Sequence, residues 1–88
     1  MDKKEALKIV QRDGLELKNL SVHFKKDKEI VLEAVKQDGR ALEDADKSFR
    51  KDKKIALEAV KNNADAFEWI DESLEKDADI LKVANKNK

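Results

Sequence analysis

The chain has 88 residues, 45% of them charged, and its 20 basic residues balance its 20 acidic ones. Without cysteine it can form neither a disulfide nor a thiolate metal site. The charge balance argues against general attraction to nucleic acid or anionic membranes, and no apolar run approaches the roughly 18–20 residues of a membrane span. The N-terminal MDKKEALKIV also lacks the apolar stretch of a signal peptide. We therefore expect a soluble, intracellular protein.

The sequence repeats itself every 25 residues. Residues 27–51 and 52–76 align without a gap and are identical at 13 of 25 positions. Periods of roughly 20–50 residues are typical of solenoids, in which each unit buries its apolar face against its neighbours. We predict an all-α fold, a short right-handed α-solenoid of about three and a half two-helix repeats. These would form one domain, 1–88, with units at 2–26, 27–51, 52–76 and 77–88.

Each unit begins with an aspartate, which suits a helix start because its carboxylate accepts hydrogen bonds from the free N–H groups of the first turn. These aspartates are Asp2, Asp27, Asp52 and Asp77. They predict long helices near 3–12, 28–37, 53–62 and 78–85, with shorter ones between them, about seven in all. The apolar residues of the second long helix sweep about 200°, much more than the stripe of a surface helix: Ile30, Val31, Leu32, Ala34 and Val35. This helix is expected to lie between the second helices of its own and of the preceding unit.

Gly14 and Gly39 occupy one position in consecutive units. Glycine often ends a helix in the left-handed conformation, which its missing Cβ permits. The third unit has Ala64 there, so Asn63 is expected to take the left-handed role, which asparagine tolerates.

A second helix is predicted from Arg40 to about Arg50. Its apolar residues have helical spacing: Ala41, Leu42, Ala45 and Phe49. Asp46 and Ser48 compete for backbone hydrogen bonds and could interrupt it, so its continuity is left open.

The end units differ from the middle ones, and the differences indicate which side of each long helix faces a neighbouring unit. Glu5 replaces the isoleucine found at Ile30 and Ile55, and Lys82 replaces the leucine found at Leu32 and Leu57. We expect Glu5 and Lys82 to be exposed, the isoleucines and leucines to be buried, and the array to be complete, since terminal repeats need polar outer faces.

The string DKEIVLEAVKQDGRALEDADKSFRKD resembles the tandem repeats of domain of unknown function 4116, whose members look like D-[KR]-E-[IV]-V-L-x-A-V-x-x-[DN]-G-x-A-L. The resemblance covers essentially the whole chain. Ala64 in place of glycine and Asp46 in place of serine are departures. The resemblance implies a multi-copy helical repeat. It brings no established activity and no catalytic residues.

The sequence offers no catalytic constellation. His23 is the only histidine and has no visible serine or cysteine partner. Asp44-x-Asp46-x-Ser48 resembles the start of a calcium loop, but Phe49 stands where glycine is needed and Ile55 where glutamate is needed. We predict no enzyme activity, no catalytic residue, no metal and no cofactor.

Basic residues gather at the junctions between units. Lys25, Lys26 and Lys28 lie at one junction, and the next has Arg50, Lys51, Lys53 and Lys54. Stacked units would align them into a basic ridge that could hold a phosphate-rich partner. The simpler interpretation is that the ridge balances the acidic residues and solubilises exposed turns. No aromatic residue is interleaved with it, as single-strand binding would favour.

Three apolar residues stand where other units are polar. Leu15 and Val22 occupy positions that are charged later, and Trp69 replaces Asn19 and Asp44. They form the candidate interaction surface. Trp69 is expected to pack against the final helix near Leu81 or Val83; the alternative is that it marks a partner site.

Repeat arrays expose extended surfaces and usually act by binding. The predicted function is therefore a protein-interaction or scaffold module with an unidentified protein partner, as a monomer or weak homo-oligomer without a membrane association. The alternative is anion or nucleic-acid binding through the basic ridge, with nucleic acid the less favoured partner.

Overall fold

The computed structural model describes residues 1–86, which contain helices and no strand. The long helices are α1 (Lys3–Arg12), α3 (Lys28–Gln37), α4 (Lys53–Asn62) and α5 (Ala78–Lys86). Their first residues lie 25 positions apart. The predictions of an all-α protein and of these four helices are confirmed.

Each second segment contains two short helices where one was expected. Most are 3₁₀ helices, written η: η1 (Gly14–Asn19) precedes the α-helical turn α2 (Val22–Lys25), η2 (Gly39–Asp44) precedes η3 (Lys47–Lys51), and η4 (Ala64–Trp69) precedes η5 (Glu72–Leu74). Residues 1–86 therefore hold ten helical elements, and the expected number of about seven is wrong.

The break within the second segment has a local cause and is held by the neighbouring unit. Ala45 is extended (φ −78°, ψ 158°), and the Asp46 carboxylate then accepts hydrogen bonds from the N–H and the Oγ of Ser48 at 3.1 and 2.6 Å. The Asp46 N–H donates to the carbonyl of Lys25 at 3.1 Å. The continuous helix from Arg40 to Arg50 is thus replaced by a kink at the residues that were expected to compete for the backbone.

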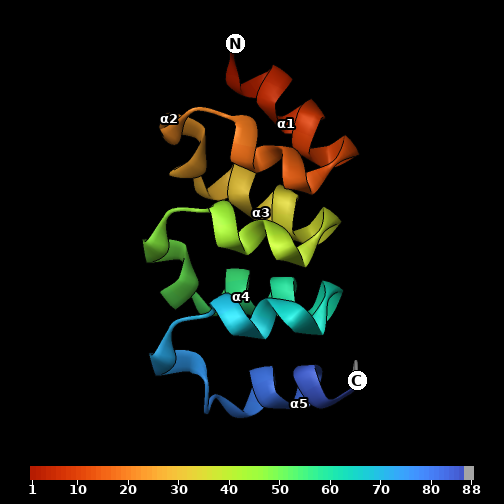
Figure 1. Ribbon diagram of the computed structural model, residues 1–88, viewed down its shortest axis with the longest axis vertical. Coiled ribbons are helices and arrows are strands. Elements are labelled where there is room, and N and C mark those ends of the chain that lie inside the picture. Colours follow the sequence, from red (N-terminus) through yellow and green to blue (C-terminus); the bar gives the residue numbers. More distant parts are fainter. Residues whose placement is uncertain (87–88) are drawn as a thin grey trace.

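The helices form two layers with a third column at one edge (Figure 1). The helices α1, α3, α4 and α5 pack side by side in chain order, and η1, η2 and η4 pack in the same order in front of them. The short helices α2, η3 and η5 follow the left edge, and α1 and α5 lie at opposite ends. The α3 helix contacts both η1 and η2, as its wide apolar arc predicted.

The buried and exposed residues are those predicted from the repeat, with one exception. Ile30 and Ile55 are fully buried, and Glu5 and Lys82 are exposed, as expected. Leu32 and Leu57 are only half-buried, so their predicted burial is wrong. They lie at the edge of the apolar arc, where the neighbouring helix does not cover the whole side chain.

The two glycines serve close packing and not a left-handed turn. No described residue has a positive φ, and Asn63 is extended (φ −150°), so both left-handed predictions are wrong. A Cβ on Gly39 would collide with the carbonyl oxygen of Ala59, and one on Gly14 with that of Ala34. The Gly39 N–H also donates to Oδ1 of Asn62 at 2.7 Å. Each glycine therefore lets a 3₁₀ helix touch the backbone of the next long helix.

Ala64, which stands in the third unit where the earlier units have this glycine, lies beside a small hollow. The hollow of about 140 Å³ separates η4 from α5 and is lined by Ala64, Phe67, Leu81, Ala84 and Asn85. Ala64 therefore carries a methyl group at the position where the glycines of the earlier units allow close contact.

The aspartates that begin the units cap the long helices, and those of the second, third and fourth units also bind lysines across unit boundaries. The Asp52 carboxylate accepts from the N–H groups of Lys54 and Ile55 at 3.0 and 3.3 Å, and Lys28 Nζ lies 3.0 Å from it. Lys3 pairs with Asp27 in the same way, and Lys53 with Asp77, both at 3.2 Å. These exposed ion pairs contribute little individually, because solvent screens them.

This arrangement predicts a loss of stability in acid. Burial alone would raise the pKa of Asp52, but the bond from Lys28 and those from the backbone N–H groups outweigh it, so the pKa lies below its usual value. A lowered folded-state pKa stabilises the protein above the unfolded pKa of about 3.9, and that stability is lost as pH falls through the folded value. Urea unfolding at a series of pH values should show this decline.

Asp52→Asn is the matched variant, because asparagine still caps a helix but cannot ionise. It should flatten the decline below about pH 4 relative to the natural chain. Equal acid sensitivity of both proteins would contradict the role assigned to the ionised Asp52.

Candidate interaction surface

Two of the three predicted surface residues share one hollow. Leu15 of η1 and Trp69 of η4 are half-buried and lie at opposite ends of an open depression of about 330 Å³. Charged residues from η1 and η2 complete its lining: Lys18, Arg40, Glu43 and Asp44. The depression therefore crosses three units in the layer of η1, η2 and η4.

Val22, the third residue, lies on the adjoining edge and is the most exposed large apolar side chain apart from Met1, at 63%. It lines a second depression of about 410 Å³ together with residues of the next unit. Glu43 and Asp44 line both depressions, so the two are neighbours. The fold thus brings Leu15, Val22 and Trp69 to one side of the molecule.

Trp69 does not occupy the place expected from the sequence. The hollow beside the final helix is lined by Phe67 and Leu81, whereas Trp69 lines the depression with Leu15 and Arg40. The indole packs partly against the core but faces the earlier units. The comparison with Val83 directed the indole toward the last unit, whereas Trp69 lines a depression with residues of the first two units.

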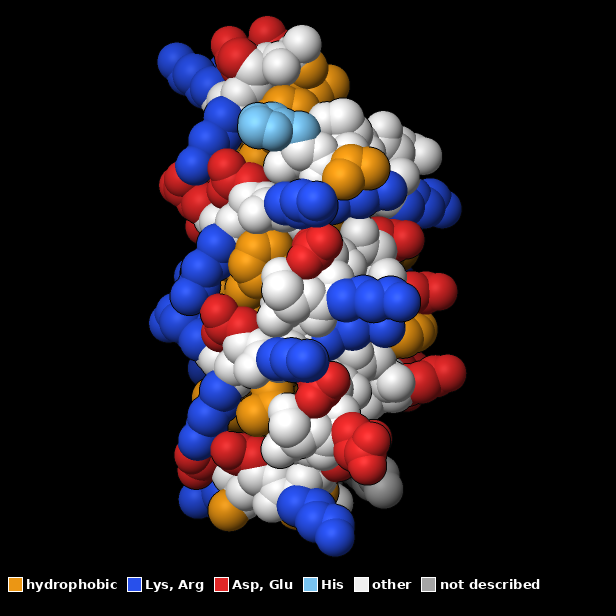
Figure 2. Space-filling model, turned by 90° about the vertical axis from the view of Figure 1, so that its left-hand side faces the viewer, with side chains coloured by type: hydrophobic (Ala, Val, Ile, Leu, Met, Phe, Trp, Pro, Cys, Tyr) orange, Lys and Arg blue, Asp and Glu red, His pale blue; other side chains and the backbone are white. Residues whose placement is uncertain are grey.

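The predicted basic ridge is interrupted by carboxylates. Lys28 pairs with Asp52, and Lys53 lies 3.2 Å from Asp77 and 2.8 Å from Asp79. Figure 2 shows Lys and Arg side chains alternating with Asp and Glu along this side of the molecule. The ridge is therefore a mixed surface.

Of the remaining ridge residues, Lys26 and Lys51 lie near carboxylates and Arg50 binds a backbone carbonyl group. Arg50 Nη2 donates to the carbonyl of Glu43 at 2.9 Å. Lys26 lies close enough to Asp46 to help lower the pKa of that carboxyl, although the bonds from Ser48 are the larger cause. In the part of the chain that the structure describes, five ridge residues take part in no salt bridge: Lys25, Lys26, Arg50, Lys51 and Lys54.

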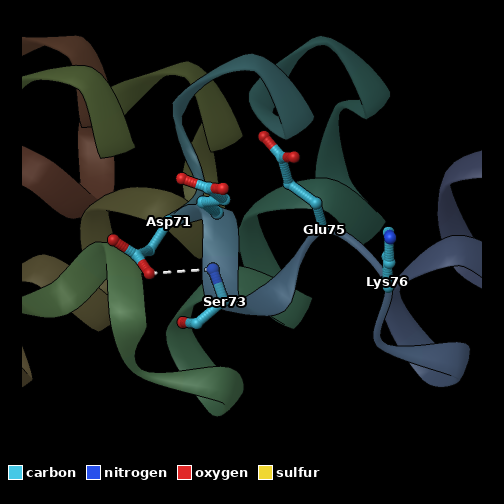
Figure 3. Close-up of a pocket in the computed structure, with 5 residues that line it drawn as sticks. Asp71, Ser73, Glu75 and Lys76 are labelled. Atoms are coloured by element: carbon cyan, nitrogen blue, oxygen red, sulfur yellow. Dashed lines mark hydrogen bonds between the residues drawn. The ribbon is translucent and has the colours of Figure 1, made fainter.

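The third unit carries an acidic depression around η5. It measures about 550 Å³ and is lined by Asp71, Glu72, Ser73, Glu75 and Lys76. In Figure 3 the Asp71 carboxylate accepts a hydrogen bond from the Ser73 N–H, 2.9 Å long, while the Glu75 side chain points elsewhere. The carboxylates do not converge, and residues 1–86 contain no group of three or more His, Cys, Asp or Glu that could hold a metal ion.

His23 is exposed and its ring meets Phe24 edge-on, with centroids 5.6 Å apart.

The distribution of charge along the short helices is a feature that the sequence reasoning missed. Residues 14–26 have three lysines against one glutamate, a net charge of +2. Residues 64–76 have one lysine against five acids, a net charge of −4. Comparing charge unit by unit would have found this gradient, which the zero total conceals.

These features define an all-α protein of tandem helical units with a mixed apolar and charged surface on its short-helix layer. A family model described as Domain of unknown function (DUF4116) matches the chain three times, at residues 2–50, 40–76 and 52–88. The chain belongs to this family. No curated protein and no solved structure matches it. Among the described residues, every helix is too short and too polar to cross a membrane.

Proposed function

We propose that the chain is a non-enzymatic protein-interaction or scaffold module. Its units at 2–26, 27–51, 52–76 and 77–88 would form one domain, a short right-handed α-solenoid. The side chains that serve binding are Leu15, Val22 and Trp69, in the layer of η1, η2 and η4 and on its edge. Stacked helical units suit this role because they present a broad, rigid surface.

The observation that carries the proposal is the exposure of Val22 beside the depression of Leu15 and Trp69. These side chains come from the first and third units, and the fold places them on one side. Exposed apolar side chains within a polar rim are typical of protein contact sites, and tryptophan is enriched where such contacts contribute most binding energy.

A capture experiment tests this function. Purified chain is immobilised and exposed to a lysate of the source cells, in parallel with Val22→Glu and with Leu81→Glu. Leu81 is the matched control, because it is an exposed leucine (37%) on α5 that lines neither of the two depressions. We expect partners that bind the natural chain and Leu81→Glu but not Val22→Glu. Equal capture by all three would contradict the proposed surface.

The alternative, anion or nucleic-acid binding through the basic ridge, receives less support because Asp52 and Asp77 neutralise two of its lysines. Nucleic-acid binding by several cations falls steeply with salt concentration. We expect the chain to be eluted from heparin at low salt, and Lys26→Glu/Lys51→Glu to change this little. Strong, salt-sensitive retention that the double variant abolishes would favour the alternative.

A further inference from the structure

We propose that the layer of η1, η2 and η4, with its edge of α2, η3 and η5, binds a second copy of this chain in an antiparallel, two-fold symmetric dimer. The inference rests on the proposed function and names one partner of the same surface. The first unit of one copy would lie against the third unit of the other, with the second units meeting at the two-fold axis.

Charge complementarity carries the proposal. The short helices at the two ends of this surface have opposite net charges, +2 over residues 14–26 and −4 over residues 64–76. The middle segment, residues 39–51, has four basic residues against three acids and is nearly neutral. An antiparallel pair places each basic end on an acidic end, whereas a parallel pair would juxtapose like charges, which is costly.

The charges involved are available for such contacts. Lys18, Lys26, Glu68 and Glu72 are exposed. Over residues 1–86 none of these four side chains belongs to a salt bridge. Lys18 and Glu68 occupy the equivalent position in the first and third units. An antiparallel pair therefore brings the lysine of one copy opposite the glutamate of the other.

The apolar side chains support the same orientation. Leu15 and Val22 belong to the basic end and Trp69 to the acidic end, so each end of the pair would combine the apolar residues of both copies. A two-fold interface must be self-complementary, and this surface supplies both halves of the contact from one chain.

The size of the surface suits a dimer. Figure 1 looks along the shortest axis onto this layer, and the two longer extents of the molecule are 38 and 22 Å. A rectangle of these extents encloses roughly 800 Å², which is the upper limit for this face and about the area that each partner contributes to a stable protein interface.

Paired charge reversals test the dimer. Sedimentation equilibrium is measured for the natural chain, for Lys18→Glu/Lys26→Glu and for Glu68→Lys/Glu72→Lys. We expect the natural chain to dimerise, more strongly at low ionic strength, and each variant alone to dimerise at least about tenfold more weakly. Mixing the two variants should restore much of the dimer, because the two reversed pairs of side chains then face each other with opposite charges.

Lys4→Glu/Lys8→Glu is the matched control, since it changes two exposed lysines of α1 outside the surface and gives the same net charge as the first variant. It should dimerise like the natural chain. Circular dichroism checks that all variants remain helical. A natural chain that stays monomeric at low salt, or a mixture that fails to associate, would overturn the dimer. Val22-dependent capture of another protein would then still leave the proposed function standing.

Discussion

Replacing Ile55 by alanine is expected to lower the free energy of unfolding by about 2–5 kcal/mol. Ile55 is fully buried in α4, between the layers, and its truncation removes apolar contacts and leaves a cavity. Small domains have a total stability of about 5–15 kcal/mol, so this one change would remove a large share of it.

Leu57→Ala is the control for this prediction, because it deletes a side chain of similar volume from the same helix. Leu57 is half-buried, and its loss should cost about 1–2 kcal/mol, since part of its surface is already in water. Urea unfolding followed by circular dichroism measures both. A larger loss for Leu57 than for Ile55 would show that the core lies on the leucine side of the helix.

Gly39→Ala should destabilise the protein by about 1–3 kcal/mol or more, although alanine is the better helix former. The added methyl group would strike the carbonyl oxygen of Ala59, so η2 and α4 would have to separate. That movement would also weaken the hydrogen bond from the Gly39 N–H to Asn62. The expected result is a lower urea midpoint with an unchanged slope.

Ala64→Gly tests the same position where the close approach is already absent. Its cost should be within about 1 kcal/mol, the usual effect of exchanging alanine for glycine in a helix. If Gly39→Ala instead stabilises the protein, the added methyl group does not force η2 away from α4, and the predicted collision with Ala59 is wrong.

Much of the fold could be predicted because its signals are local. Asp27 and Asp52 cap helices whose first N–H groups lie two or three residues away, so the sequence alone places the starts of α3 and α4. The exposure of Glu5 and Lys82 likewise follows from comparing equivalent positions, because each is charged where the middle units carry an apolar residue.

The candidate surface depended on contacts that no local rule describes. Leu15, Val22 and Trp69 differ from the polar residues at equivalent positions of other units, but the sequence does not show that Trp69 lines one depression with Leu15. The basic ridge lost much of its charge because Lys28 and Lys53 reach aspartates of the next unit. Such ion pairs depend on the distance between successive units, which the spacing of residues within one unit does not give.

The sequence by itself determined that this protein is all-α, where its long helices begin and that its units recur. Only the tertiary structure decided why Gly14 and Gly39 are glycines. A left-handed cap was the expectation from local conformational preference, whereas both residues lie against the carbonyl group of a helix about twenty residues away. Local preferences involve neighbours along the chain, but the distance between two backbones depends on the packing of whole layers.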